Sequence, residues 1–233
     1  MSERIRIKRM TPAMRIIHWL TVISVVACVI TGYYIAYPYY QAQISAPAAE
    51  TFVMAWNRWV HFIGAILLDV LSIWVIYLYF FSRFDKPYKK LIPNRANLVE
   101  YAQVVRNLFT LNRNPKEFDT RHSDSFNTVN FAILHILLAL MLFTGLQLYV
   151  HGFGSGHSAI GSWWPWVLHV ATDWTLWVFD GKIGVRVAHH ALMYAVMAWA
   201  MLHIYYQVWR TVFWREGDIN IVFGGEKFAR PKA

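Results

Sequence analysis

The sequence has few charged residues and almost no cysteine. Only 15% of its 233 residues are Asp, Glu, Lys or Arg, and Cys28 is its single cysteine. One cysteine excludes an internal disulfide, a cluster of thiolate metal ligands and a CxxCH motif for covalent haem attachment. Cys28 itself is therefore expected to be a small apolar residue that faces lipid or a neighbouring helix.

Acidic residues are scarcer than basic ones, and the net charge is +9. Nucleic acid is nevertheless not expected as a partner, because the basic residues flank apolar segments instead of forming a basic run with interleaved aromatics. Hydrophobic residues make up 57% of the chain, with 12 Trp, 13 Tyr and 15 Phe. This composition indicates an integral membrane protein, with lipid as its surroundings.

Four apolar runs are long enough to cross a bilayer, and they cover residues 14–37, 56–81, 126–150 and 185–213. The first run lacks a convincing small-residue cleavage site, so we expect a membrane span and not a signal peptide. Residues 163–179 are too short to span and carry five tryptophans, which suits a helix lying in the membrane interface. We predict an all-α integral membrane protein, a four-transmembrane-helix bundle with an additional interfacial outer helix, in a single membrane domain, 1–233.

The basic residues predict the orientation of these spans. The N-terminal tail through Arg15, the loop 83–121 and the segment 210–233 hold 19 of the 22 Lys and Arg. By the positive-inside rule both termini are expected in the cytoplasm, in a bacterial-type cytoplasmic (inner) membrane, and the loop 151–184 faces outward. A short surface helix is expected around 98–108 in the cytoplasmic loop.

Histidines recur at two depths of the predicted bundle. His189 and His203 are fourteen residues apart on the last span, which places them on nearly one face and about 21 Å apart along the axis. His61 lies at the depth of His189, and His18 lies at the depth of His203. Because imidazole is a common axial ligand of haem iron, we predict that His61 and His189 bind an outer haem and that His18 and His203 bind an inner haem, both non-covalently.

Other interpretations of the polar residues stay open. His135 is a rival ligand for the inner haem, and a proton relay is an alternative in which Asp69 is the strongest acidic candidate. Zinc is disfavoured because the spans supply almost no acids or thiols. Gly32, Gly64 and Gly145 either leave room for a porphyrin or allow close helix packing.

Several of these residues form signatures of a known family. Arg15–Leu20 with Thr31–Tyr33, then His189-His190 leading to His203 and Tyr205, and the tail 216–225 all resemble the cytochrome b subunit of membrane-bound nickel–iron hydrogenases. The resemblance implies a protein with two haem b groups whose partners are a small iron–sulfur subunit and a large nickel–iron subunit on the outer face. No hydrogen chemistry would occur in this chain. The membrane subunits of formate dehydrogenases have a similar ligand layout and are the alternative.

The resemblance also implies a route for electrons in a respiratory chain. Electrons from hydrogen would enter at the outer haem, cross to the inner haem and reduce a quinone near it. Candidate quinone residues that cluster by predicted depth are His122, Asp124, Asn127 and Tyr205, although the same residues suit an ordinary solvated loop end. A function of a different class, a small transporter that depends on His and Asp69, is the remaining alternative.

Overall fold

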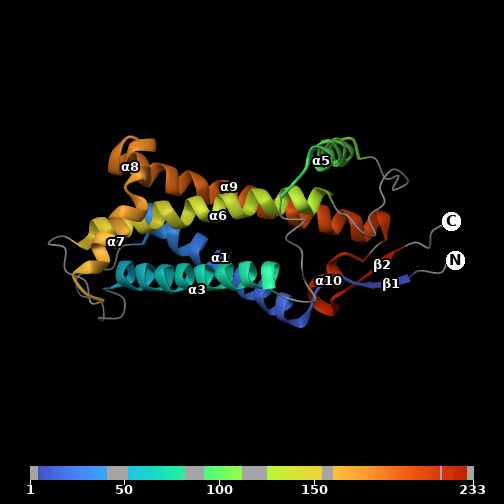
Figure 1. Cartoon of the computed structure of the whole chain (residues 1–233), viewed down its shortest axis with the longest axis horizontal. Helices are drawn as coiled ribbons and strands as arrows, with labels where there is room; N and C mark the ends of the chain where they lie inside the picture. Colours follow the sequence, from blue (N-terminus) through green and yellow to red (C-terminus); the bar gives the residue numbers. More distant parts are fainter. Residues whose placement is uncertain are drawn as a thin grey trace.

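The computed structural model describes residues 5–40, 52–81, 92–111, 125–153, 160–215 and 217–229. Four long helices dominate it, namely α1 (Pro12–Ala36), α3 (Val53–Phe81), α6 (Ser125–Val150) and α9 (Gly181–Trp209). All four are long and apolar enough to cross a membrane. They run lengthwise beside one another, with both chain termini at one end of the bundle (Figure 1). The predicted all-α membrane bundle is confirmed.

The bundle consists of two closely packed helix pairs. Helix α1 packs along α3, and α6 packs along α9 (Figure 1). A Cβ on Gly64 of α3 would lie only 2.9 Å from Sγ of Cys28 on α1, so the absence of a side chain lets these two backbones approach. Gly64 and Cys28 therefore serve helix packing, as expected for a small apolar cysteine.

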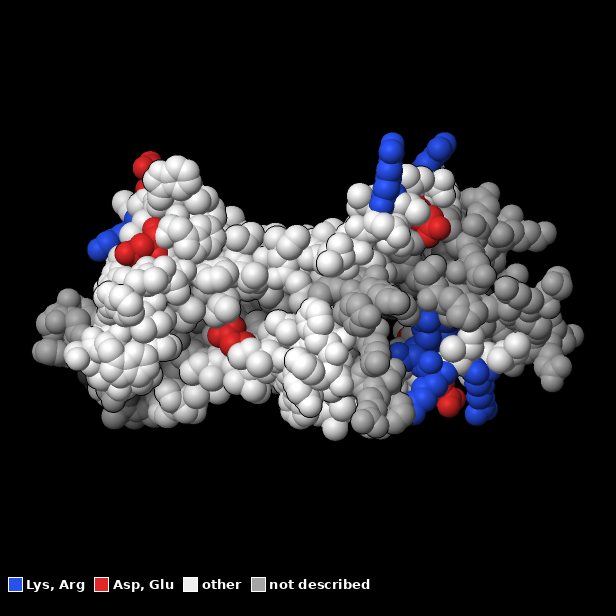
Figure 2. Space-filling model, viewed as in Figure 1, with Lys and Arg blue, Asp and Glu red and all other residues white. Residues whose placement is uncertain are grey.

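Charge is distributed as a membrane protein requires. Figure 2 shows the Lys and Arg side chains at the two ends of the molecule, with a larger group at the end that carries the termini, and an almost uncharged middle. The exposed side chains along the helices are mostly large and apolar, for example Ile73 at 67% and Met201 at 65%. Such exposure is stable only against lipid or another apolar surface.

The last long helix begins four residues before the expected start at residue 185. Asp180 has φ 57° and Gly181 has φ 85°, and this left-handed pair separates α9 from the preceding segment. Glycine adopts such a conformation without steric cost, which is why the chain can turn here. At its other end α9 continues into a short π-helical turn, η3 (Arg210–Trp214).

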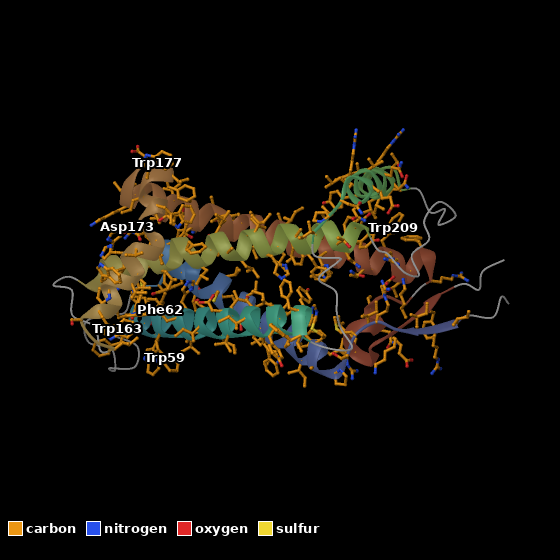
Figure 3. The ribbon with its side chains drawn as sticks, in the orientation of Figure 1. Trp59, Phe62, Trp163, Asp173, Trp177 and Trp209 are labelled. Carbon is orange, nitrogen blue, oxygen red and sulfur yellow. The ribbon has the colours of Figure 1, made fainter. Side chains whose placement is uncertain are left out.

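The segment expected as one interfacial helix forms two. Helices α7 (Trp163–Thr172) and α8 (Trp174–Val178) lie across the end of the bundle where α6 ends and α9 begins (Figure 1). We call this the α7–α8 end. Trp59, Trp163 and Trp177 are all found there (Figure 3), and the 87% exposure of Trp177 suits an indole at a membrane interface.

The opposite end, which we call the terminal end, carries the small elements. Strand β1 (Ile5–Lys8) pairs antiparallel with β2 (Glu226–Ala229), and α10 (Ile219–Gly224) precedes β2. The expected surface helix is α5 (Arg95–Phe109), which begins three residues before the expected start because Asn94 and Asn97 form a capping box. It packs on α6 and α9 through a core of Val104, Leu108, Phe126, Tyr206 and Trp209, the last labelled in Figure 3.

Candidate functional site

Two of the predicted histidines meet between the helix pairs. His61 comes from α3 and His189 from α9, and their ring centroids are 6.5 Å apart with an angle of 69° between the ring planes. Helices of both packed pairs therefore contribute to one site close to the α7–α8 end. The structure brings together the two residues that the sequence analysis assigned to a common depth.

A threonine contacts each of these rings. Thr31 Oγ1 of α1 lies 3.0 Å from Nδ1 of His61, and Thr144 Oγ1 of α6 lies 2.8 Å from Nδ1 of His189. With Nδ1 engaged in both rings, Nε2 is the nitrogen left for a ligand. Each helix pair thus contributes one histidine and one supporting threonine.

The glycine that follows each threonine leaves room for the same ring. A Cβ on Gly32 would lie 3.2 Å from Cε1 of His61, and a Cβ on Gly145 would lie 3.2 Å from Cε1 of His189. The space at these two glycines is filled by imidazole. Their role here is to let a histidine ring lie against a helix backbone.

The repeated Thr-Gly pair was not recognised in the sequence analysis. Thr31 was noted only as part of a family signature, Gly32 and Gly145 were also noted as small residues that leave room for a porphyrin or a helix, and Thr144 was not singled out. The sequence does contain a signal, because Thr-Gly occurs near the same predicted depth in the first and third spans. Only the contacts with His61 and His189 show what the repeat does.

The second predicted pair lies farther from the α7–α8 end, and we call it the deeper pair. His18 is fourteen residues from Gly32 on α1, and His203 is fourteen residues from His189 on α9. Both therefore lie about 21 Å along their helices from the first pair, towards the terminal end. Since Gly32 and His189 both border the first site, we expect His18 and His203 to lie at a common depth.

A tryptophan supports each histidine at this second depth. The ring of His203 stacks on Trp199, with centroids 5.0 Å apart and planes 7° apart, and Trp199 Nε1 donates a hydrogen bond to the carbonyl oxygen of Asn130 on α6 at 2.9 Å. The ring of His18 packs edge-on against Trp19 at 5.6 Å. The sequence analysis assigned no role to Trp199.

Trp19 also ties the site to the C-terminal tail. Its Nε1 donates to the carbonyl oxygen of Val222 at 3.0 Å, and its ring lies 5.2 Å from that of Phe223. Arg15, one turn earlier on α1, donates to the carbonyl oxygen of Phe223. Helix α10 therefore braces the part of α1 that carries His18.

The other intramembrane histidines have different surroundings. His135 Nδ1 lies 2.6 Å from the carbonyl oxygen of Phe131 on its own helix, and its ring is 5.9 Å from that of Tyr79. The ring of His190 lies between those of Tyr37 and Tyr194, at 5.3 and 5.1 Å. The partners in these contacts are residues other than His61 and His189.

The candidate quinone residues are described only in part. Asn127 Oδ1 accepts a hydrogen bond from Gln207 Nε2 of α9 at 3.2 Å. Tyr205 is 44% exposed, and its ring lies 6.0 Å from that of Trp209. His122 and Asp124 lie outside the described residues. Asn127 is near the start of α6 and Tyr205 is near the end of α9.

A polar network joins α6 to α7 beyond the first histidine pair. Gln147 is fully buried; its amide nitrogen lies 3.1 Å from Nε2 of His151 and donates to Oδ1 of Asp173 at 3.1 Å. Burial acts to raise the pKa of Asp173, but hydrogen bonds from His169 and Gln147 outweigh it and lower that pKa overall. Burial, followed by the positive charge of Lys182, lowers the pKa of His151.

The described part of the chain contains no group of three or more His, Cys, Asp or Glu that could hold a metal ion. A facing pair of imidazoles instead suits a metal that already has other ligands, as haem iron has from its porphyrin. The geometry of His61 and His189 therefore fits a haem better than a bare ion.

A comparison with known families agrees with this chemistry. The sequence pattern of the prokaryotic cytochrome b561 family matches residues 9–225. The chain belongs to this family. Membership implies a b-type haem and a role in electron transport, and the match includes all four membrane helices and all four predicted ligands.

Curated relatives of this cytochrome b561 chain are similar over most of their length. A probable Ni/Fe-hydrogenase B-type cytochrome subunit of Rhodobacter capsulatus is 26% identical over 215 residues, covering 91% of this chain and 78% of the relative. The protein of the same description from Bradyrhizobium diazoefficiens is 27% identical, with 91% and 82% covered. The one from Rhizobium leguminosarum bv. viciae is 24% identical, with 94% and 87% covered.

Proposed function

We propose that this chain is the di-haem cytochrome b subunit that carries electrons from a nickel–iron hydrogenase to quinone across the membrane. The observation that carries the proposal is the meeting of His61 and His189 at 6.5 Å, with Nδ1 of both rings engaged by threonines. The chain would act as a single membrane domain, residues 1–233, and the hydrogen chemistry would lie in its partners.

The spacing of the first pair supports haem ligation. An imidazole nitrogen lies about 2 Å from a bound metal ion, so two imidazoles on opposite sides of one ion have ring centres about 6 Å apart. The observed 6.5 Å is close to this value. His61 and His189 would hold the haem, which would supply one-electron redox chemistry, and with both imidazoles bound to its iron neither oxygen nor substrate would be expected to bind there.

A second haem on His18 and His203 is supported by the common depth expected for them. The two pairs lie about 21 Å apart along the helices, because each helix contributes a fourteen-residue interval. Two redox groups at these depths would provide a path for single electrons through the apolar bundle. Trp199 and Trp19 hold the deeper rings against α6 and α10.

The charge distribution supports the direction of this path. Most of the Lys and Arg that the structure describes lie at the terminal end, which the positive-inside rule places in the cytoplasm. The α7–α8 end then faces outward, and a small iron–sulfur subunit with its large nickel–iron subunit would deliver electrons there. Two relatives are described as probable B-type cytochrome subunits of Ni/Fe hydrogenases, which supports these partners.

The quinone would accept electrons at the terminal end, near the deeper haem. The candidate residues are Asn127 and Tyr205 together with His122 and Asp124. His122→Ala tests this part separately, because it is expected to leave both haems in place and to reduce the rate of quinone reduction. Unchanged quinone reduction in that variant would contradict the assignment.

Haem counting tests the proposal directly. We expect two b-type haems per purified full-length chain by pyridine haemochrome analysis, and the loss of one in each single variant His61→Ala, His189→Ala, His18→Ala and His203→Ala. His135→Ala and His190→Ala are matched controls that should retain two. A chain with fewer than two haems, or a His135→Ala variant that loses one, would overturn the ligand assignment.

Co-purification separates the hydrogenase from the alternatives. Nickel–iron and iron–sulfur subunits should accompany the tagged chain from its native membrane. Recovery of a formate dehydrogenase would instead favour that type of complex. A reduced-minus-oxidised spectrum without a b-type band would leave a transporter that uses Asp69 as the better explanation.

A further inference from the structure

We propose that Thr31 and Thr144 are positioning residues, which hold His61 and His189 in the tautomer that has its proton on Nδ1. In this tautomer Nε2 of each ring presents a lone pair to the space between the rings. The effect on haem rests on the function proposed above, whereas the tautomer itself is a property of the chain alone.

The argument begins with the hydroxyl of Thr31. Its Oγ1 lies 2.6 Å from the carbonyl oxygen of Ala27, one turn earlier on α1, and 3.4 Å from that of Cys28. A carbonyl oxygen can only accept a hydrogen bond, and a hydroxyl has a single proton to donate. The hydroxyl proton of Thr31 is therefore committed to its own helix.

The contact between Thr31 and His61 must then run in the opposite direction. Oγ1 is 3.0 Å from Nδ1 of His61 and has only lone pairs left to offer, so Nδ1 must be the donor. A neutral imidazole that donates from Nδ1 carries no proton on Nε2. The threonine thereby selects one of two tautomers, of which only this one can bind iron through Nε2.

The second helix pair repeats this arrangement. Thr144 Oγ1 lies 2.7 Å from the carbonyl oxygen of Leu140 and 2.8 Å from Nδ1 of His189. The same count of donors and acceptors makes Nδ1 of His189 a donor. Gly145, like Gly32, keeps the ring against the backbone beside its threonine, where the hydrogen bond can form.

This hydrogen bond has a defined consequence for a bound haem. A histidine that donates from its second nitrogen is a more basic metal ligand, which favours the more highly charged, oxidised iron. Removing one acceptor should shift the reduction equilibrium of the outer haem about three- to tenfold towards the reduced state, as expected for the loss of one hydrogen bond. The inner haem, about 21 Å away, should not respond.

The first experiment reads the tautomers without haem. Nitrogen-15 NMR of the haem-free full chain, at a pH where both rings are neutral, should show a protonated Nδ1 and an unprotonated Nε2 for His61 and His189. Thr31→Val should convert His61 to a mixture, whereas Thr31→Ser should retain the single tautomer. Ser24→Ala is the matched control, because Ser24 also donates to a carbonyl one turn earlier on α1, that of Leu20 at 2.9 Å.

The second experiment uses the haem-loaded chain. A redox titration should show one of two waves shifting upward in Thr31→Val and in Thr144→Val, but neither wave shifting in Ser24→Ala. The serine variants should behave as wild type. A merely structural role would lower haem content without this pattern, so haem content is measured on the same samples.

The outcomes separate this inference from the proposed function. An Nε2–H tautomer in the wild-type chain, or valine variants with two haems and unchanged potentials, would overturn the positioning role. Thr→Ser variants that behave like the Thr→Val variants would also overturn the positioning role. If the chain purified from haem-replete cells contains no haem, yet its histidines show the Nδ1–H tautomer, the haem proposal is refuted and the threonine assignment stands. If Thr31→Val fails to fold, Thr144→Val and the serine variants still decide the question.

Discussion

At the scale of single residues, the first histidine site depends on side chains that are small. Imidazole can lie against a helix backbone only where the neighbouring helix has no Cβ, and both Gly32 and Gly145 meet this condition. The threonine before each glycine is close enough to meet Nδ1 of the same ring. One dipeptide therefore gives both space and a hydrogen-bond acceptor to each histidine.

Gly145→Ala tests the spatial requirement. The new Cβ would lie 3.2 Å from Cε1 of His189, tight enough to displace the ring by a few tenths of an ångström. Because ligand geometry controls metal binding, we expect the outer haem to dissociate severalfold faster, measured by transfer of haem to an acceptor protein. Gly152→Ala is the control, since no heavy atom lies within 4 Å of its Cβ position. Equal haem loss in both variants would contradict the prediction.

At the scale of helices, two different kinds of contact hold the bundle together. Helix α1 approaches α3 where Gly64 meets Cys28, and α6 is joined to α7 by the amide of Gln147. The first contact is apolar and depends on the small size of the side chains at the two positions. The second is polar and depends on protonation, because its partners are His151 and Asp173.

Gly64→Ala should weaken the contact between α1 and α3. Its Cβ would lie 2.9 Å from Sγ of Cys28, and overpacking of this kind typically costs about 1–3 kcal/mol. Cys28→Ala removes the clashing atom, so the double variant should recover most of the loss. Unfolding in mixed micelles with increasing SDS measures the free energy of unfolding of the single and of the double variant. A double variant as unstable as Gly64→Ala would show that another contact is limiting.

The junction between α6 and α7 should loosen in acid. The pKa of His151 is lowered in the folded chain, so its contribution to stability is present above pH ~6.5 and is lost as the pH falls through the lower folded value. The pKa of Asp173 is also lowered, and its contribution is lost in a second step below pH ~4. Protonation of His151 at Nε2 removes the acceptor that faces Gln147.

Fluorine NMR of 5-fluorotryptophan-labelled protein can follow these two steps. Trp174 is the reporter, because it directly follows Asp173 and its ring centroid lies 5.5 Å from that of Phe143 on α6. Trp174→Phe assigns its signal. His151→Gln should abolish the upper step and keep the lower one, whereas Asp173→Asn should do the reverse. Loss of both steps in either variant would contradict the separate assignments.

At the scale of the whole molecule, the two ends differ in construction. The α7–α8 end is rich in exposed tryptophan, whereas the terminal end closes through β1, β2 and α10 (Figure 1). A fully buried ion pair lies at the terminal end, where Arg210 Nε meets Asp218 Oδ2 at 2.9 Å. This pair joins the end of α9 to the residue before α10, which in turn contacts Trp19 beside His18.

Asp218→Ala should therefore affect the deeper haem before the outer one. Removing one partner of a buried ion pair typically costs about 3–5 kcal/mol, because the other charge remains buried. We expect reduced stability and selective loss of the haem assigned to His18 and His203. Haem content and a redox titration measure this loss. Arg215→Ala, at an exposed position, is the control. Loss of the outer haem first would contradict the proposed coupling.

Much of the architecture could be predicted from the sequence, because a membrane helix converts sequence distance into depth. The rise per residue is constant, so four apolar runs predict four spans, and the intervals from His18 to Gly32 and from His189 to His203 predict matched depths. The rings of His61 and His189 lie 6.5 Å apart, as two residues at one depth can, and their assignment as haem ligands stays a prediction. The assignment of His18 and His203 stays a prediction as well.

The sequence by itself thus determined the class of fold and the number of spans, and it predicted the depth of the histidines, since each follows from local composition and helical rise. Only the tertiary structure decided which helices pair, that Thr31 and Thr144 face the histidine rings, and that α10 packs on Trp19. These features depend on the rotation of each helix about its axis and on contacts between distant segments. A local sequence pattern does not encode helix rotation or distant contacts, because both are selected by packing against the other helices.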